Sequence, residues 1–340
     1  MQYVKGDILT QDGFKKGYLG FEGYKVVELS KRSPPEKPVA QGFIVPTFVN
    51  AHTHIGDSFV RRKNIELPRN AEELVAPPNG LKHRLLRKAS EKEIIDGMKS
   101  SVNEMIEAGT SHFCDFREDG IDGVYQLQNA LKNKKINSMV LSRPWQMRYD
   151  KKELELLLKN SDGIGLSSIS DWEYSEIEKI TKHAKHEKKI FALHASEAVR
   201  EDIDLILDLK PDFLVHMVSA TESDLARVKE ENTPVIICPR SNAFFNLKTN
   251  LKLMKKTGID LMLGTDNAML NVPNVLEELI YLKNSTSAFS TQELLNMITY
   301  TPRKALNLDD CIHGPTSYGN FVVLNRGSLE LVYIFKKNKR

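Results

Sequence analysis

The sequence GFIVPTFVNAHTH, residues 42–54, decides how the rest of the chain is interpreted. Its segment Phe43–Val49 is an almost unbroken apolar run, which is typical of a strand buried on both faces, as in a parallel sheet. The stretch ends with His52 and His54. Two residues apart on an extended backbone, these side chains point to the same side and can bind one ion. The stretch therefore predicts a buried strand that delivers two imidazoles to one place.

Seven further apolar runs follow and alternate with helical patterns. In the segment Tyr174–Lys188, for example, Ile177, Ile180 and Ala184 share one face while the charges share the other. With the first strand, the predicted strands are Phe43–Val49, Ser111–Phe116, Ser138–Ser142, Gly163–Ser167, Ile190–His194, Phe213–His216, Val235–Cys238 and Leu261–Thr265. Eight strand-helix alternations favour an α/β fold with a closed (β/α)8 TIM barrel over an open sheet.

Both ends of the chain carry shorter strand patterns, several of them bounded by Gly-containing turn signals. These strands are predicted at Tyr3–Leu9, Gly17–Phe21, Tyr24–Leu29, Tyr318–Leu324 and Leu329–Phe335. We expect them to pair into a small β-sandwich domain formed by residues 1–42 and 310–340. The barrel would then comprise residues 43–309.

The segment Ser58–Ser90 is long, rich in Arg and Pro, and inserted directly after the His pair. Barrel enzymes keep their sites at the carboxyl ends of the strands, so a segment in this position lies over the mouth of the barrel. We therefore expect it to form a lid or a wall of the pocket.

The composition limits the classes of function. A hydrophobic content of 41% in 340 residues is enough for one large core with an appendage. The formal charge of +3 gives no reason to expect nucleic acid or an anionic membrane as partner. Cys114, Cys238 and Cys311 are odd in number and far apart, which argues against a disulfide framework. No apolar run approaches the ~18 residues of a membrane helix, so we expect a soluble, cytoplasmic protein with a small-molecule substrate.

Metal-competent side chains stand where the predicted strands stop. His194 and His216 each close an apolar run, and Asp266 follows another. Each has an ordinary alternative when taken alone, because a His at a strand end often makes a polar contact and an Asp after Gly-Thr often caps a helix. Together with the His pair, however, all five lie at the carboxyl ends of predicted barrel strands. The set predicts a metal hydrolase that leaves one coordination position for water.

The same motifs resemble those of the amidohydrolase superfamily. The opening stretch is similar to the first barrel strand of that family, which ends in His-x-His, although Thr47 stands where Gly is usual. The segment His194–Glu197 resembles the fifth-strand His-x-x-Glu of the deaminase branch, and His216 matches its sixth strand. Cys238–Asn242 resembles the Cys-Pro-x-Ser-Asn segment, and Gly264–Asn267 resembles the eighth-strand Gly-Thr-Asp. This branch contains cytosine, guanine, adenosine-nucleoside and triazine deaminases.

The resemblance implies one divalent metal ion, zinc or iron, with His52, His54, His194 and Asp266 as ligands. Binuclear relatives use a carboxylated lysine of the fourth strand to bridge two ions. Because Gly163–Asp171 contains no lysine, we expect a single metal.

Three residues are expected to carry the proton chemistry of a water attack. We expect Asp266 to accept the proton of the water and Glu197, three residues beyond His194, to deliver a proton to a ring nitrogen or leaving group. His216 is expected to hydrogen-bond the attacking oxygen. Glu197 has an alternative as a first-turn acid of the next helix, where the helix dipole favours it.

Four further residues are candidates for binding the substrate. Arg117 follows the second predicted strand and Trp145 the third. An Arg pairs with a carboxylate or phosphate, and a Trp stacks on a flat ring. Asn242 and Asn267 are expected to orient polar groups at the mouth. Each has a structural alternative, namely ion pairing or rim packing for the first two and turn formation for the asparagines.

These expectations converge on hydrolytic deamination of a nitrogenous heterocycle. The alternative is hydrolysis of an amide, a cyclic amide or a halogenated ring by the same chemistry, and it is distinguished by a carboxylate or halide product in place of ammonia. A scaffold protein with a structural metal would require a missing acid or a closed coordination shell. The resemblance also makes a homodimer a candidate assembly.

Overall fold

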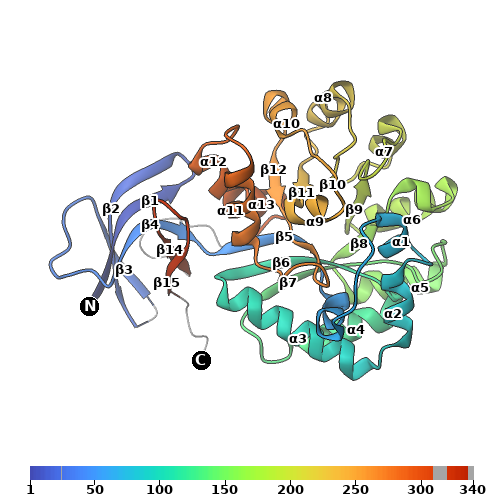
Figure 1. The fold of residues 1–340 in the computed structure, drawn as a ribbon, viewed down its shortest axis with the longest axis horizontal. Coiled ribbons are helices and arrows are strands. Elements are labelled where there is room, and N and C mark those ends of the chain that lie inside the picture. The colour runs from blue at the N-terminus through green and yellow to red at the C-terminus, as the bar shows by residue number, and fades with distance from the viewer. Residues whose placement is uncertain (24, 309–319, 336–340) are drawn as a thin grey trace.

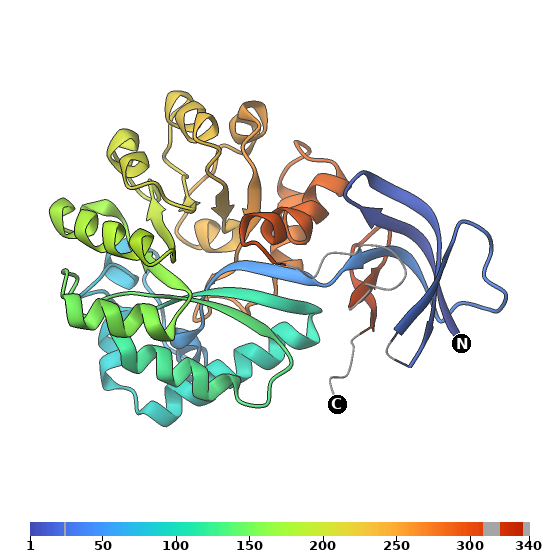
Figure 2. The same cartoon turned by 180° about the vertical axis from the view of Figure 1, so that it is seen from behind.

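The computed structural model describes residues 1–23, 25–308 and 320–335. Two sheets dominate it, and they lie next to each other along the long axis of the molecule (Figure 1). One is a curled nine-stranded parallel sheet with helices outside it, and the other is a six-stranded sheet made from segments near both ends of the chain (Figure 2). Among the described residues, no helix is both long and apolar enough to cross a membrane.

The parallel sheet follows the chain, since each strand from β5 to β12 pairs with the next. Its strands are β5 (Phe48–His54), β6 (Thr110–Arg117), β7 (Asn137–Ser142), β8 (Gly163–Leu166), β9 (Ile190–Ala195), β10 (Phe213–His216), β11 (Val235–Ile237), β12 (Leu261–Leu263) and β13 (Asp266–Asn267). Seven of the eight predicted strands thus appear within a few residues of their expected bounds. Parallel order places all their carboxyl ends at one end of the sheet.

The two edges of this sheet meet at the segment that contains β12 and β13. Gly264 N donates a hydrogen bond to Ile237 O at 3.1 Å, and Thr265 N donates to His52 O at 2.9 Å. The segment therefore bonds to β11 on one side and to β5 on the other, and the sheet curls round. A Cβ on Gly264 would lie 2.6 Å from the Cβ of His52, so only glycine fits at this closure.

The bounds predicted for the first barrel strand are wrong. Residues 40–46 form β4 (Ala40–Pro46), which belongs to the six-stranded sheet, and β5 begins only at Phe48. The apolar run looked like one strand because β4 and β5 are both buried, one in each sheet. Pro46 is the last residue paired with β14, and the chain passes between the sheets at Thr47. His52 and His54 consequently lie inside β5 rather than beyond its end.

Helices connect successive strands and cover the outer face of the parallel sheet (Figures 1 and 2). The first long one begins with a capping box, in which the Ser90 side chain accepts from Glu93 N and the Glu93 side chain accepts from Ser90 N. These helices are α3 (Glu91–Glu107), α4 (Gly120–Leu131), α5 (Lys151–Asn160), α6 (Tyr174–His186), α7 (Ile203–Asp208), α8 (Glu222–Glu230), α9 (Pro239–Phe244), α10 (Leu251–Thr257), α11 (Val275–Ser285), α12 (Thr291–Asn296) and α13 (Tyr300–Ala305), with a short η2 (Ile169–Asp171). The insertion after β5 forms η1 (Ile55–Lys63), α1 (Ala71–Leu74) and α2 (Leu81–Lys88).

The six-stranded sheet folds over on itself. Its order is β15 (Leu331–Phe335), β14 (Phe321–Leu324), β4, β1 (Gln2–Thr10), β2 (Gly13–Glu22) and β3 (Lys25–Ser30). Phe21 on β2 lies with its ring centroid 6.0 Å from that of Phe321 on β14, although two strands separate them in the sheet. Neighbouring strands are ~4.8 Å apart, so this contact requires strong curvature. The division expected after residue 42 falls inside β4, and residues 309–319 and 336–340 lie outside the described residues.

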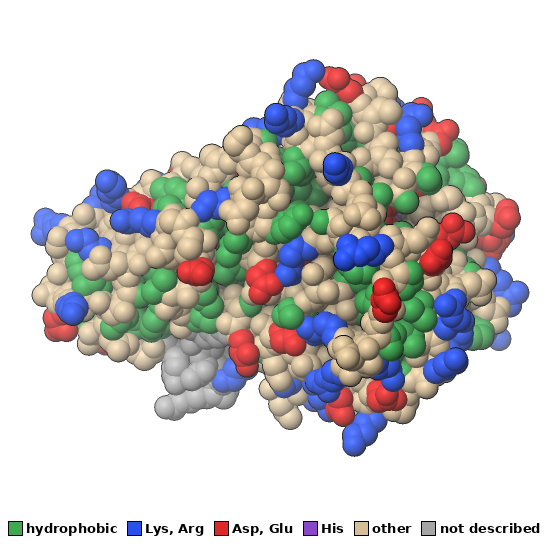
Figure 3. Space-filling view, in the orientation of Figure 1, with side chains coloured by type: hydrophobic (Ala, Val, Ile, Leu, Met, Phe, Trp, Pro, Cys, Tyr) green, Lys and Arg blue, Asp and Glu red, His purple; other side chains and the backbone are tan. Residues whose placement is uncertain are grey.

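The interior of the parallel sheet is packed with side chains from several strands. This cluster includes Val49, Cys114, Phe116, Phe213 and Met262. Cys114 and Cys238 are both free and buried there, and Cys311 lies outside the described residues. On the molecular surface, positive and negative side chains are interspersed over the face seen in Figure 3.

Candidate active site

A cavity of about 440 Å³ lies at the carboxyl ends of the parallel strands. One side of it, which we call the strand-end wall, contains His54, Glu118, His194, His216 and Asp266. The other side, the insertion wall, contains Ala71, Val75, Pro77, Lys82 and His83. The insertion thus forms a wall of the pocket, as the sequence predicted. Glu197 and Asn267 also line the cavity.

The predicted metal ligands converge on one point of the strand-end wall. His194 Nε2 lies 3.3 Å from His52 Nε2 and 3.3 Å from His54 Nε2. Asp266 Oδ1 lies 3.3 Å from His52 Nε2 and 3.7 Å from His54 Nε2. Ligand atoms ~2.1 Å from a tetrahedral zinc ion lie ~3.4 Å apart, so this spacing fits one divalent metal ion.

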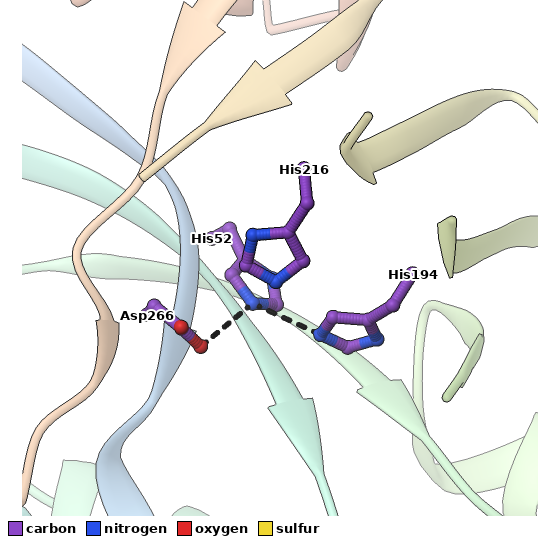
Figure 4. A group of neighbouring side chains, drawn as sticks. All are labelled: His52, His194, His216 and Asp266. Carbon is purple, nitrogen blue, oxygen red and sulfur yellow. Dashed lines mark hydrogen bonds and ion pairs between the residues drawn. The ribbon is translucent and has the colours of Figure 1, made fainter. Parts of the chain in front are cut away.

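His216 belongs to the same cluster. The side chains of His52, His194, His216 and Asp266 point toward one another from four different strands (Figure 4), and each offers a ligand atom within 4.8 Å of the others. Both ring nitrogens of His216 have polar neighbours that are not members of the cluster. Nδ1 lies 3.5 Å from Asn242 Nδ2, and Nε2 lies 3.6 Å from Glu197 Oε2. His216 is therefore placed both beside the cluster and beside the candidate acid.

Outer partners orient two of the imidazoles. His194 Nδ1 lies 2.8 Å from Leu166 O, an arrangement that turns Nε2 toward the cluster. His54 Nδ1 lies 2.8 Å from Glu118 Oε1, so a carboxylate faces the ring nitrogen of His54 that points away from the cluster. Such partners on the far nitrogen are typical of metal-binding histidines.

The protonation states in the cluster also suit a cation. Burial lowers the pKa of His52, and it lowers the pKa of His54 to about 3, with a further contribution from Lys82. The pKa of His194 is likewise well below its usual range. Burial alone would raise the pKa of Asp266, but the hydrogen bond with His52 and the neighbouring imidazoles hold it well below the usual value. Neutral imidazoles beside an ionised carboxylate are the ligand forms that a divalent metal requires.

The backbone is unusual at the cluster. His216 and Asp266 adopt left-handed conformations, with φ of 77° and 59°. Left-handed non-glycine residues are uncommon and store strain, on the order of 1–3 kcal/mol each. The pairing of β5 with β6 also shifts register between Asn50 and Thr53, beside His52. Irregularities of this kind re-aim side chains at functional sites, and here they accompany three of the converging residues.

Glu197 stands at the edge of the cluster, three residues beyond His194. Its side chain is 21% exposed, into the cavity. Burial, reinforced by the negative charges of Asp266 and Asp171, raises the pKa of Glu197 to about 8. The raised pKa favours the protonated form of Glu197, which can donate a proton.

The structure does not bring all the candidate substrate contacts to the cavity. Trp145 is 65% exposed and lines two other hollows of the surface. Arg117 is buried, and its guanidinium pairs with Asp115 at 3.2 Å and Glu118 at 2.5 Å. Asn242 is buried behind His216. Of the four, only Asn267 is among the residues lining the cavity.

The sequence analysis did not identify a group of buried charged side chains beside the candidate metal ligands. Lys82 Nζ lies 2.5 Å from Glu118 Oε1, and Asp57 Oδ2 is 3.6 Å from the same nitrogen. Glu118 follows β6 directly, so the strand-end rule that selected His194 could have found it. Lys82 lies in the insertion, where no periodic pattern marks it.

Comparison with known proteins shows which family the chain belongs to. The family model described as the amidohydrolase family matches residues 43–313. A putative aminohydrolase of Archaeoglobus fulgidus is 34% identical over 82% of this chain and 78% of its own length. A 5-methylthioadenosine/S-adenosylhomocysteine deaminase of Caldicellulosiruptor saccharolyticus is 25% identical over 82% of this chain and 68% of its own.

Two solved structures share the fold. The aminofutalosine deaminase of Helicobacter pylori, in complex with methylthio-coformycin, superimposes with a TM-score of 0.74 at 15% identity and covers 100% of both chains. The atrazine chlorohydrolase of Arthrobacter aurescens, complexed with zinc, has a TM-score of 0.70 at 14% identity and covers 96% of this chain and 87% of its own.

Proposed function

Because this chain belongs to the amidohydrolase family, we propose that it is a metal-dependent hydrolase that deaminates a nitrogenous heterocycle such as a purine, pyrimidine, pterin or triazine. The observation that carries the proposal is a cluster of four metal-competent side chains beside a cavity that the carboxyl group of Glu197 also lines. Relatives named as deaminases support this chemistry. The relative named as a chlorohydrolase supports hydrolysis of a halogenated ring as the alternative.

The proposed ligands are His52, His54, His194 and Asp266. Four separations among their ligand atoms, those of His194 and Asp266 from the two histidines of β5, are 3.3–3.7 Å and support this set. A divalent cation held there supplies Lewis acidity that makes water a nucleophile at neutral pH. The solved relative that contains zinc favours zinc over iron as the ion to test first.

The chain's own residues handle the protons. Asp266 is ionised and touches the ligand cluster, so it is the proposed acceptor for the proton of the attacking water. Glu197 delivers a proton to the ring nitrogen on which charge develops. His216 donates a hydrogen bond to the attacking oxygen, since its Nε2 lies 3.6 Å from Glu197 Oε2 and its ring centroid lies 5.3 Å from that of His194.

Among the residues named from the sequence, Asn267 is the proposed substrate contact, since it lines the cavity. The ion pairs of Arg117 support a structural role for that residue. The contact of Asn242 with His216 supports an orienting role. The exposure of Trp145 supports a place outside the site.

We also propose that β12 and β13 are two halves of one eighth strand, which makes the sheet a (β/α)8 barrel. The hydrogen bonds of Gly264 and Thr265 to opposite neighbours support this assignment. The proposed domain boundary moves from residue 42 to Thr47, where the chain leaves the six-stranded sheet.

The experiment is to measure bound metal per chain and then to screen purines, pyrimidines, pterins and triazines for ammonia release. We expect about one metal ion per chain and metal-dependent release of ammonia from at least one ring class. Release of a carboxylate or a halide without ammonia would favour the alternative. A protein that binds no divalent metal would contradict the proposal.

A further inference from the structure

One lysine of the insertion is connected to the proposed metal ligands by two separate chains of polar contacts. Lys82 lies in the first turn of α2, and only 2% of it is exposed. A buried lysine is costly unless its charge is paired. Lys82 Nζ pairs with Glu118 Oε1 at 2.5 Å and donates a hydrogen bond to Asn267 Oδ1 at 2.8 Å. Asp57 Oδ2 lies 3.6 Å from the same nitrogen. Glu118 follows β6 and Asn267 lies on β13, the two strands that flank β5.

The first route passes through Glu118 to His54. Glu118 Oε1, the oxygen that faces Lys82, is the one that lies 2.8 Å from His54 Nδ1. The other oxygen of Glu118 is held by Arg117 Nη2 at 2.5 Å. Both oxygens of the carboxylate are therefore held by cations, and the held carboxylate lies against Nδ1 of His54 while Nε2 faces the cluster.

The second route passes through Asn267 to Asp266. An ammonium group has donors only, so it selects the carbonyl end of the Asn267 amide. The NH₂ group of Asn267 then faces Asp266, and Nδ2 donates a hydrogen bond to Asp266 Oδ1 at 3.0 Å. Asp266 Oδ1 is the oxygen that approaches His52 Nε2 at 3.3 Å.

We propose that Lys82 is a positioning residue of the metal centre, which orients His54 through Glu118 and Asp266 through Asn267. The insertion helix α2 is then part of the metal centre as well as a wall of the pocket. This inference rests on the proposed function, because it takes His54 and Asp266 as ligands.

The test is metal binding by the purified apo protein, measured without substrate. Zinc affinity is determined by competition with a chromophoric chelator, and the geometry of the site is followed by the visible absorption of bound Co²⁺. We expect Lys82→Met to weaken zinc binding about 10- to 100-fold, the usual effect of losing an outer partner of a metal ligand, and to change the Co²⁺ spectrum. The matched control is Lys88→Met in the same helix, where the side chain is exposed and no change is expected.

Lys82→Met leaves Glu118 with one cation fewer, and this variant can fail to fold. The double variant Lys82→Met/Glu118→Gln removes both charges and keeps the side-chain shape at 118, and in that case its zinc affinity is compared with that of Glu118→Gln alone. A folded variant lacking Lys82 that keeps wild-type zinc affinity and Co²⁺ spectrum would overturn the inference. Failure of the wild-type protein to bind either metal would instead overturn the proposed function.

Discussion

The two walls of the cavity are built differently. The strand-end wall carries the metal-competent histidines and Asp266 on β5, β9, β10 and β13, all strands of the parallel sheet, and the first three are hydrogen-bonded on both sides. The insertion wall is carried by the four-residue α1 and the eight-residue α2. Its lining is mostly apolar or small, with Lys82 and His83 as its basic side chains.

This difference suggests that the strand-end wall carries the reaction and the insertion wall determines which substrate binds. Residues on paired strands hold positions to within the small tolerance that metal ligation and proton transfer require. Short helices on a long insertion change shape and sequence at little cost to the sheet, so they are suited to define which ring fits. Lys82 is the point at which the two walls are joined, through its contacts with Glu118 and Asn267.

The largest expected effect comes from removing a proposed metal ligand of the strand-end wall. Asp266→Ala is expected to lose the bound metal and to lower kcat/KM by more than about 10³-fold, since metal activation is worth several kcal/mol. Metal analysis and steady-state ammonia release check this. Asp260→Ala, just before β12 at the amino ends of the parallel strands and with a side chain 53% exposed, should behave like wild type. An Asp266→Ala protein that retains its metal would remove Asp266 from the ligand set.

A smaller effect is expected at His216, which lies beside the ligands. His216→Ala should lower kcat about 10²- to 10³-fold, as the loss of a hydrogen bond to a developing oxyanion does, while the metal content stays at the wild-type level. Measuring kcat and metal content together distinguishes a residue that stabilises the transition state from a metal ligand. Loss of most of the metal would make His216 a ligand and would extend the metal set beyond the four proposed residues.

The pH dependence tests the acid at the edge of the same wall. The pKa of Glu197 is raised to about 8 by burial and then by Asp266 and Asp171, so its proton is present below that pH and is lost above it. We expect kcat/KM to fall about tenfold per pH unit above pH 8. In Glu197→Gln, which is expected to be about 10²- to 10⁴-fold slower, this alkaline limb should vanish. Its persistence would assign the limb to another group.

The smallest effect is expected outside both walls. Trp145→Ala should change kcat/KM by less than about twofold, because the side chain is 65% exposed and does not line the cavity. Steady-state kinetics with the substrate found in the screen check this. A large increase in KM would show that Trp145 moves over the ring during binding, and it would add a third surface to the two walls.

Much of the strand-end wall could be predicted because it follows local patterns. A polar residue at the end of a buried apolar run has little choice of location once the strands are parallel, and this rule identified His194, His216 and Asp266. Applied to the predicted strand end at Phe116, the same rule selected Arg117, which in the structure pairs with Asp115 and Glu118. Applied to the observed end of β6 at Arg117, it selects Glu118.

The bounds of β4 and β5 show the limit of pattern reasoning. The apolar run through residues 43–49 indicates that the segment is buried. It does not indicate in which of the two sheets each part is buried, because that depends on the hydrogen-bond partners. The partner of β4 is β14, near the far end of the chain, and the partners of β5 are β6 and β13. Partner choice is a long-range property that a local window does not contain.

The sequence by itself determined the order of strands and helices, the family, and the donors able to bind a metal, because these depend on residue type and spacing along one segment. The tertiary structure alone decided that Lys82 reaches Glu118 and Asn267, and that Trp145 stays outside. Those outcomes depend on how the insertion docks, and a buried charge finds its partners only after distant segments have packed and excluded water.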